Sequence, residues 1–285
     1  MHVVVVGGSG QLGQSLLARS PEGWRISALS STQLDVRAAS VAEQLVALQP
    51  DAIVNAAAYT AVDAAEHDAA AAFAVNHEGA QKVALAAKSL GCRLIYVSTD
   101  YVFDGQKMAA YEETDAPAPL NVYGRSKLAG EQATLGAHPE ALILRTSWLF
   151  SEYPPNFVQT LFHKTRSQSE VEVVHDQIGR PTYAGDVATA IYTLLAMPSM
   201  PNGPLHYGGN RAISWFGLAQ AVQKIVAQYQ PDAPQALLKP VLSSHYPDSA
   251  PRPHYAVLNT AKSQALGLPP SDWLTQMVHT LDQHY

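Results

Sequence analysis

Residues 2–13, His-Val-Val-Val-Val-Gly-Gly-Ser-Gly-Gln-Leu-Gly, decide the fold of this chain. The β-branched run Val3–Val6 predicts a buried strand, and a helix is expected over Gln11–Ala18, directly after the glycines. Gly7 permits a tight turn, Gly10 lets the backbone approach a pyrophosphate, and Gly13 allows the helix to pack closely on the strand. Glycines placed between a strand and a helix therefore predict a dinucleotide site, with a plain strand–turn–helix corner as the alternative.

Strands and helices alternate through the rest of the first half of the chain. Further strands are expected over Arg25–Leu29, Ala52–Asn55, Leu94–Ser98 and Leu142–Arg145. A capping box at Ser40 and Glu43 predicts the start of a helix that ends at Leu48. A longer helix is expected over about Ala70–Leu90, with Gly91 ending it. This alternation predicts an α/β fold with a Rossmann-like, doubly wound parallel sheet, in which ligands bind at the carboxyl ends of the strands.

The pattern loosens after residue 150, where proline becomes frequent. Helices are expected there over Phe157–Ser167, Ala184–Ala196, Ser214–Gln228 and Asp272–Leu281. Residues 231–253 contain repeated prolines and are expected to form an irregular connection over a surface or cleft. We therefore predict a dinucleotide-binding Rossmann domain over residues 1–150, to which some later segments return, and a smaller, mainly substrate-binding lobe over residues 151–285.

Composition and charge narrow the class of protein. The chain has 285 residues, of which 47% are hydrophobic and 15% charged, which suits a globular protein with a sizeable core. A net charge of −6 without any basic run argues against a nucleic-acid partner. Charged residues interrupt the alanine-rich stretch 56–74 and no signal-peptide pattern opens the chain, so we expect a cytoplasmic protein without a membrane span. The single cysteine, Cys92, is expected to be a structural thiol, and no cysteine cluster offers a metal site.

Tyr123 and Lys127 stand four residues apart in Asn-Val-Tyr-Gly-Arg-Ser-Lys-Leu-Ala-Gly-Glu. On a helix this spacing puts both side chains on one face. The ammonium group favours the phenolate, so we expect it to lower the pKa of the tyrosine and to make the pair an acid/base unit. Chance occurrences of Tyr-x-x-x-Lys on exposed helices are common, but this one follows the fourth strand of a chain that carries the glycine motif. Together the two motifs predict hydride transfer to or from a carbonyl.

Thr99 follows the fourth strand, where a hydroxyl would lie above the carboxyl edge of the sheet. We expect it to hydrogen-bond the substrate ketone and to help set the pKa of Tyr123, with a backbone-capping threonine as the alternative. In the expected reaction Tyr123 gives its proton to the developing alkoxide. Lys127 stabilises the tyrosinate and bonds the nicotinamide ribose.

The second strand ends at Leu29-Ser30-Ser31 and lacks the acid that would grip a ribose 2′-hydroxyl. Small hydroxyl side chains leave room for a 2′-phosphate, so NADPH is the expected cofactor and NADH the second choice. Asp35 and Val36 suit contact with the adenine, a solvated loop carboxylate being the alternative for Asp35. Arg37 could reach a 2′-phosphate.

These motifs resemble those of the extended short-chain dehydrogenase/reductases and, more narrowly, those of the dTDP-4-dehydrorhamnose reductase family. The similar segments are the glycine pattern, Asn55–Asp63, Ser98–Gly105, Asn121–Glu131, Leu144–Trp148, Asp176–Thr182 and Arg252–Pro253. The resemblance thus covers almost the whole chain. It implies NAD(P)H-dependent reduction of the 4-keto group of dTDP-4-dehydro-β-L-rhamnose to dTDP-β-L-rhamnose, the last step in making a sugar donor for bacterial surface polysaccharides.

The resemblance also implies roles for individual residues. Those at the cofactor are Gly10, Gln11 and Leu12 at the pyrophosphate, Asp35 and Val36 at the adenine side, and Ala58, Tyr59, Thr60 and Val97 along the cofactor channel. Those around the sugar are Thr99, Asp100, Tyr123 and Trp148, the last either as a stacking wall or as packing between the lobes. Arg252 is a candidate phosphate clamp, because a planar guanidinium suits phosphate recognition, and a surface salt bridge is its alternative.

The chain departs from the family pattern at two points. Arg180 stands where family members often have a small residue, and it could meet the nucleotide's pyrophosphate or pair with an acid. Some members hold Mg²⁺ through glutamates at a dimer interface, one of them early in the first helix. Here Gln14-Ser15-Leu16 offers no carboxylate, which argues against Mg²⁺. A homodimer is compatible with the resemblance.

Two other functions stay open on the sequence alone. An epimerase or 4,6-dehydratase of the same superfamily would keep the tyrosine and lysine and recycle a tightly held NAD. A dehydratase would also need a carboxylate pair directly after the threonine of strand four, whereas Asp100 is followed by Tyr101. A non-catalytic regulatory subunit, related to the β subunit of methionine adenosyltransferase, is the third hypothesis. Intact Thr99, Tyr123 and Lys127 argue for activity without excluding it.

Overall fold

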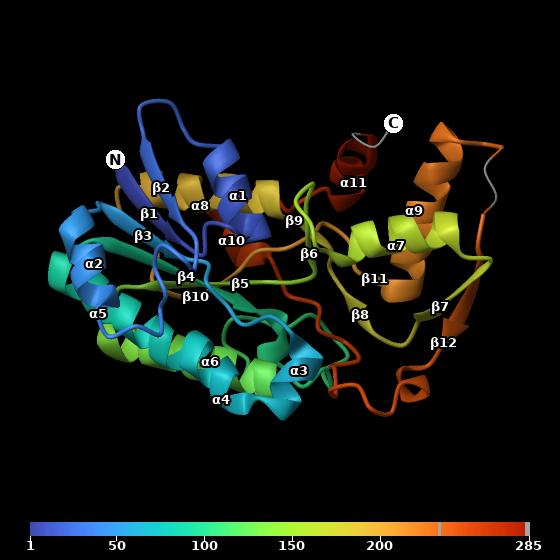
Figure 1. The fold of residues 1–285 in the computed structure, drawn as a ribbon, viewed down its shortest axis with the longest axis horizontal. Coiled ribbons are helices and arrows are strands. Elements are labelled where there is room, and N and C mark those ends of the chain that lie inside the picture. The colour runs from blue at the N-terminus through green and yellow to red at the C-terminus, as the bar shows by residue number, and fades with distance from the viewer. Residues whose placement is uncertain (233–234, 283–285) are drawn as a thin grey trace.

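A six-stranded parallel sheet with the order β10-β5-β4-β3-β1-β2 forms the centre of the protein in a computed structural model, which describes residues 1–232 and 235–282 (Figure 1). Its strands are β1 (His2–Val6), β2 (Arg25–Leu29), β3 (Ala52–Asn55), β4 (Arg93–Thr99), β5 (Leu142–Thr146) and β10 (Gly203–His206). From β1 the chain adds β2 on one side and then β3, β4 and β5 on the other. The switch point, where ligands bind in such sheets, therefore lies between the carboxyl ends of β1 and β3.

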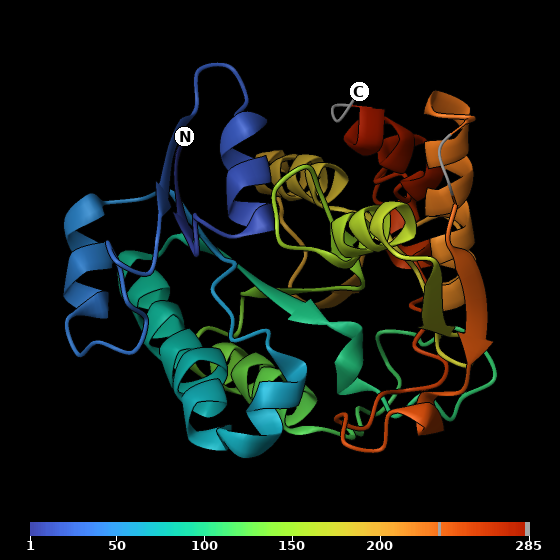
Figure 2. The same ribbon diagram turned by 45° about the vertical axis from the view of Figure 1, so that its right-hand side comes forward.

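Helices cover both faces of this sheet, as Figures 1 and 2 show. One face carries α1 (Gln11–Ala18) and α8 (Ala184–Ala196), and the other carries α2 (Val41–Leu48), α5 (Ala80–Leu90) and α6 (Val122–Ala137). Val3 and Val5 of β1 belong to the first hydrophobic core, and Val4 and Val6 belong to the second. This alternation is what the two-residue period of a strand requires, and it makes both faces of the sheet interior. The predicted doubly wound α/β sheet is confirmed.

The long helix predicted over residues 70–90 is interrupted, so that prediction was wrong in its middle. The segment consists of α4 (Ala69–Phe73), a π-helical turn η1 (Ala74–Gly79) and α5, which Gly91 ends with a φ of 63°. The π turn holds buried Asn76, whose side-chain amide bonds the backbone of Tyr59 and the hydroxyl of Ser126. Single π turns inside helices are rare and frequently lie at functional sites.

The capping box predicted at Ser40 is also wrong. Ser40 does precede α2, but its side chain caps no backbone N–H within the described part of the chain. The Ser40 hydroxyl instead accepts a hydrogen bond of 2.8 Å from the Gln44 side chain. The hydroxyl of Ser40 therefore binds a side chain one helical turn further on, instead of a backbone N–H.

A second group of elements lies beside the sheet, on the right in Figure 1. Its main members are α7 (Phe157–Ser167), β7 (Glu170–Val174), α9 (Trp215–Tyr229), β12 (Leu237–Val241) and α11 (Trp273–Asp282). Its short strands are β6 (Leu149–Phe150), β8 (Ile178–Gly179), β9 (Thr182–Tyr183) and β11 (Ile213–Ser214). The remaining short helices of the chain are α3 (Val62–His67), η2 (Asp100–Val102), η3 (Ser243–His245) and α10 (Ala261–Ala265).

The wholly irregular connection predicted for residues 231–253 was wrong over β12. This strand pairs in parallel with β7 from Leu237 opposite Glu170 to Val241 opposite Val174. Pro240 lacks a backbone N–H, but a two-stranded sheet consists only of edge strands, where proline is tolerated. Residues 233–234 of the predicted connection lie outside the described residues.

Two elements from beyond residue 150 pack with the central sheet and its helices. Strand β10 pairs with β5, and α8 packs on α1. The division of the chain into domains at residue 150 stays a prediction. Within residues 1–232 and 235–282, no helix is both long and apolar enough to cross a membrane.

Candidate active site

The glycine loop between β1 and α1 forms a tight backbone cradle. Gly7 has a φ of 86°, and the N–H groups of Gly7 and Gly8 both donate to the carbonyl of Leu29 on β2, at 3.1 and 2.7 Å. A Cβ atom on Gly13 would overlap the Gly7 carbonyl and the Gly8 backbone. Gly10 is the N-cap residue of α1 and has no side chain to cap it. The loop thus folds as the sequence predicts, with its backbone exposed at a helix N-terminus.

The start of α1 suits an anionic group. No acidic residue stands in its first turn, and the side chain of Gln14 bends back to the carbonyl of Ser9 at 2.9 Å. The Gln11 side chain is fixed from the other side, because the Ser151 hydroxyl donates to its oxygen at 3.0 Å. Backbone N–H groups and the positive end of the helix dipole therefore face the place where a pyrophosphate would lie, so the loop fits a dinucleotide.

The end of β2 is polar but carries no carboxylate. The Ser30 and Thr32 hydroxyls lie 2.8 Å apart. Asp35 is bound by both the backbone and the guanidinium of Arg37, at 2.8 to 3.1 Å, and this hydrogen bonding lowers the pKa of Asp35. Arg37 therefore pairs with Asp35 in the protein alone, while Val36 is buried. The contacts predicted for Asp35 and Val36 with the adenine, and for Arg37 with a 2′-phosphate, stay predictions.

The segment after β3 runs along the same edge of the sheet. It contains Ala58, Tyr59 and Thr60, which the sequence analysis predicted along the cofactor channel. The amide of Asn76 receives a bond of 2.8 Å from the Tyr59 N–H and donates one of 3.1 Å to the Tyr59 carbonyl. The π turn thereby fixes the backbone of this segment, a role for Asn76 that the sequence did not reveal.

Lys127 lies on the face of α6 that is packed against β4. Asn121 caps this helix by accepting the N–H of Gly124 at 2.7 Å. The Lys127 Nζ donates to the carbonyl of Val97 at 2.7 Å and lies 4.1 Å from the centre of the Tyr96 ring. Only 2% of Lys127 is exposed, and this burial lowers its pKa to about 7. The lysine is thus a fixed, nearly dry group at the end of a strand.

The expectation that Lys127 lowers the pKa of Tyr123 is wrong for the protein alone. Burial raises the pKa of Tyr123 to about 12, against a smaller lowering by its hydrogen bond with Thr99. The ammonium group of Lys127 is engaged with the Val97 carbonyl and the Tyr96 ring. Removal of water from the phenolate therefore outweighs the helical neighbour. Tyr123 is protonated throughout the neutral range, as a proton donor must be.

Thr99 and Asp100 stand at the carboxyl end of β4. The Thr99 hydroxyl donates to Asp100 Oδ1 at 3.1 Å and accepts the N–H of Tyr101 at 3.2 Å, so it also caps η2. The other carboxylate oxygen of Asp100 is buried and has no hydrogen-bond partner in the described ranges. Burial raises the pKa of Asp100 to about 7. The backbone-capping alternative is therefore present, and the hydrogen bond of Thr99 also lowers the pKa of Tyr123, while its bond to a substrate ketone stays a prediction.

Trp148 contacts a second tryptophan that the sequence analysis did not single out. Its ring stacks on Trp215 with centroids 3.3 Å apart and planes 5° from parallel, and its backbone has a φ of 47°. Phe157 meets the Trp215 ring edge-on, and the Trp215 indole donates to the Gln177 side chain at 3.2 Å. Trp215, rather than Trp148, lines the large cavity beside the site. Whether Trp148 itself meets the sugar stays a prediction.

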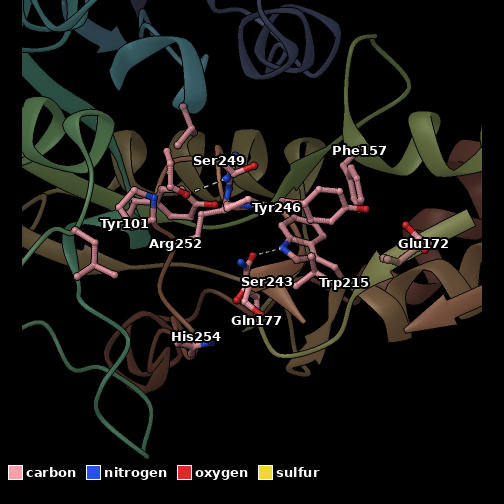
Figure 3. Close-up of a pocket in the computed structure, with 18 of the residues that line it drawn as sticks. Tyr101, Phe157, Glu172, Gln177, Trp215, Ser243, Tyr246, Ser249, Arg252 and His254 are labelled. Atoms are coloured by element: carbon pink, nitrogen blue, oxygen red, sulfur yellow. Dashed lines mark hydrogen bonds between the residues drawn. The ribbon is translucent and has the colours of Figure 1, made fainter. Parts of the chain in front are cut away.

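This cavity has a volume of about 940 Å³ and lies between the sheet edge and the second group of elements. Figure 3 shows Tyr101 beside Arg252 at one end, and Phe157, Trp215 and Tyr246 gathered at the other. Such a volume is enough for a nucleotide-sized ligand. The cavity thus joins a cationic end to an aromatic end.

Arg252, a predicted phosphate clamp, is held in place by two partners. Its Nη2 donates to Asp63 Oδ2 at 2.8 Å, and its guanidinium also bonds the Tyr101 hydroxyl. The second Asp63 oxygen accepts the N–H of Ala250 at 2.9 Å. The alternative of a salt bridge is therefore present, but Arg252 still lines the cavity. Its contact with phosphate stays a prediction.

Arg180 pairs with neutral groups, and no acidic partner for it lies within residues 1–232 and 235–282. Its Nη1 donates to the Gly209 carbonyl and the Thr260 hydroxyl, both at 3.2 Å. Among the residues that the structure describes, no group of three or more histidine, cysteine, aspartate or glutamate side chains could hold a metal ion.

Comparisons with known proteins agree on one family. The family model described as "RmlD substrate binding domain" matches residues 1–285. A dTDP-4-dehydrorhamnose reductase of Aggregatibacter actinomycetemcomitans is 37% identical in an alignment of 282 positions that covers 95% of each chain. One of Mycobacterium tuberculosis is 41% identical over 275 residues, covering 94% of this chain and 88% of the relative.

A crystal structure of dTDP-4-dehydrorhamnose reductase from Bacillus anthracis, in complex with NADP, superposes with a TM-score of 0.91. It is 34% identical in sequence, and the match covers 99% of both chains. Sequence and structure therefore agree, and the chain belongs to the RmlD substrate binding domain family.

Proposed function

We propose that this protein reduces the 4-keto group of dTDP-4-dehydro-β-L-rhamnose to the alcohol with NADPH, in the synthesis of dTDP-β-L-rhamnose. One observation carries the proposal: Lys127 bonds the carbonyl of Val97, so the tyrosine–lysine face of α6 is tied to the strand that ends at Thr99. The glycine cradle follows β1, and β3 and β4, the next two parallel strands on one side of β1, end at the same edge of the sheet. The names of the relatives, dTDP-4-dehydrorhamnose reductases, supply the substrate.

In this proposal each residue has a separate task. Bound NADPH supplies a hydride to the carbonyl carbon. Thr99 hydrogen-bonds the ketone oxygen, and Tyr123, protonated because burial raises its pKa to about 12, donates its proton to that oxygen. Lys127 then stabilises the phenolate and bonds the nicotinamide ribose. Asp100 and Trp148 border the sugar, and Arg252 binds the diphosphate.

The preference for NADPH rests on the end of β2. Serine and threonine hydroxyls stand there in place of a carboxylate, which would repel a 2′-phosphate. The Bacillus anthracis relative was solved with NADP, which supports the same choice. NADH is the second choice. The cytoplasmic location and the homodimer stay predictions.

The alternatives find less support. A dehydratase would use a carboxylate pair after Thr99, whereas the residue after Asp100 is Tyr101, whose hydroxyl bonds Arg252. A related structure named as a dTDP-glucose 4,6-dehydratase, from Streptomyces venezuelae, is only 19% identical, so its likeness supports the fold alone. For a non-catalytic subunit there would be no need to keep Thr99, Tyr123 and Lys127 together at one strand end.

The test is NADPH oxidation with the 4-keto sugar nucleotide made in situ. We expect Tyr123→Phe to lower kcat by at least about 100-fold while NADPH binding is retained, because the variant loses only the donated proton. Tyr192→Phe is the matched control, since its hydroxyl bonds the Leu16 carbonyl on the far face of the sheet. Near-normal turnover of Tyr123→Phe would refute the proton donor, and no turnover of the unaltered protein would refute the substrate.

A further inference from the structure

A buried charge cluster lies behind the tyrosine–lysine pair, and the proposed reaction does not yet use it. Glu131 and Arg145 are 3% and 2% exposed and form a two-pronged ion pair, with Nε to Oε1 at 2.9 Å and Nη2 to Oε2 at 2.7 Å. The Ser98 hydroxyl also donates to Glu131 Oε1 at 2.5 Å. Arg145 further lies over the Phe103 ring and contacts His206 at 3.4 Å. A buried ion pair is expensive in solvation, so its presence beside a reactive lysine calls for a reason.

The geometry ties this cluster to Lys127. Tyr123, Lys127 and Glu131 follow one another at four-residue intervals, so they share one face of α6. Two neighbouring residues of β4 bind the last two of these side chains: the Val97 carbonyl accepts from Lys127, and the Ser98 hydroxyl donates to Glu131. The ammonium and the carboxylate are thereby fixed against the same strand, one helical turn apart.

We propose that Glu131 is a positioning residue that keeps the Lys127 side chain protonated and in place, and that Arg145 limits how much of this negative charge acts on Lys127. The inference rests on the proposed function, in which Lys127 works as a cation. It is supported by the direction of the electrostatics, because burial lowers the pKa of Lys127 and the charge of Glu131 raises it. Without the carboxylate, burial would leave a neutral amine, which cannot stabilise a phenolate.

Other titratable groups are carried by the elements packed against α6. They are Asp63, Glu66 and His67 on α3, His77 and Glu78 on η1, Lys82 and Lys88 on α5, Tyr96 on β4, and Asp100 and Tyr101 on η2. Within this set, only Tyr96 and Asp100 are buried. Burial raises the pKa of Tyr96 well above its usual value and that of Asp100 to about 7. Tyr96 is therefore neutral, and Glu131, not Asp100, is the charge that raises the pKa of Lys127.

The test uses two variants of opposite charge effect. Glu131→Gln removes the negative charge, so Lys127 loses its proton at a lower pH. Arg145→Met removes the opposing positive charge, so Lys127 keeps its proton to a higher pH. For each variant we measure kcat/KM against pH, and NADPH affinity against pH by fluorescence titration. Both quantities should fall at alkaline pH, and these two falls are the alkaline limbs. We expect Glu131→Gln to move both limbs to lower pH, and Arg145→Met to move both to higher pH, by about one pH unit or more.

Opposite shifts distinguish electrostatics from damage, because a structural disturbance would move both variants the same way or only lower their amplitudes. No shift, or shifts in one direction, overturns the proposal. Glu78→Gln is the matched control, since it removes an exposed carboxylate from an element packed against α6, and its limbs are expected to stay at the pH of the unaltered protein.

Either single variant leaves a buried charge without its partner and could fail to fold. The double variant Glu131→Gln/Arg145→Met removes both charges and avoids this. Its limbs are expected below those of the unaltered protein, because the helical neighbour of Lys127 has the larger effect, and limbs at the original pH would overturn the proposal. NADPH titration needs no sugar, so failure of the proposed substrate would leave this test intact.

Discussion

The contact between Asp63 and Arg252 provides the sharpest test of how the large cavity holds its ligand. Asp63, on α3, accepts the Arg252 guanidinium with one oxygen and the Ala250 N–H with the other, at 2.8 and 2.9 Å. The carboxylate thereby ties the chain around residues 250–252 to the sheet side of the molecule. We expect Asp63→Asn to weaken nucleotide-sugar binding, because asparagine can keep the Ala250 bond but not the charge that orients Arg252.

The size of this effect follows from exposure. The side chain of Arg252 is 21% exposed and that of Asp63 is 57% exposed, so water screens the pair. A hydrogen bond to a charged group contributes about 1.5–3 kcal/mol when buried, and exposed pairs contribute about 1 kcal/mol or less. Taking about 1 kcal/mol, KM for the sugar nucleotide should rise roughly fivefold. High salt should shrink this difference.

The assay is steady-state kinetics with each substrate varied in turn. KM for the sugar nucleotide should rise while kcat and KM for NADPH stay constant. Glu170→Gln is the matched control, because it removes one carboxylate from the exposed ion pair with Lys239. The charge-swapped variant Asp63→Arg/Arg252→Asp would restore a pair but not a cation facing the cavity. Recovery of normal KM in this swap, or an unchanged KM in Asp63→Asn, would refute the role given to Arg252.

Three further predictions concern the glycine cradle, the stability at acidic pH and the buried thiol. Gly13→Ala should abolish NADPH binding and lower the melting temperature, since the added methyl group would overlap the Gly7 carbonyl; calorimetry and NADPH titration check this. Burial lowers the pKa of His206 from 6.5 to about 3, so its contribution to stability is complete above pH 6.5 and is lost as the pH falls toward 3. The unfolding free energy of the unaltered protein should therefore rise with pH in that window by about 1.4 kcal/mol per pH unit more than that of His206→Gln. Burial raises the pKa of Cys92 to about 11, so a disulfide reagent at pH 8 should label one thiol per chain only after denaturation, and rapid labelling of the native protein would contradict its burial.

Local patterns allowed much of the fold to be predicted. The strand–glycine–helix unit at the start depends only on neighbours in the chain, and α1 has the predicted bounds Gln11–Ala18. The four-residue spacing of Tyr123 and Lys127 likewise predicted a shared helix, and both lie on α6. The break at η1 was not predictable in this way, because it accompanies bonds from Asn76 to residues far along the chain.

Features of the site that depend on distant partners were beyond the sequence. Arg252 could be proposed as a clamp, but its partner Asp63 lies 189 positions away. Trp148 was singled out, whereas the Trp215 ring stacked on it was not. The sign of the Tyr123 pKa shift failed for the same reason. It is set by burial, a property of the assembled fold, and not by the residue four positions away.

Burial acts differently on the two members of the acid/base pair. It raises the pKa of Tyr123 to about 12, which leaves the phenol protonated and able to donate its proton to the developing alkoxide. Burial also lowers the pKa of Lys127, and the charge of Glu131 raises it, with about 7 as the result, so without that charge the amine would be neutral when a phenolate has to be stabilised. The tyrosine therefore gains from a dry site, while the lysine needs a buried anion beside it, and Glu131 is the carboxylate on its helix face. It follows that changes around the site should act mainly through Lys127, so the pH dependence of the Glu131 and Arg145 variants carries more information than that of Tyr123.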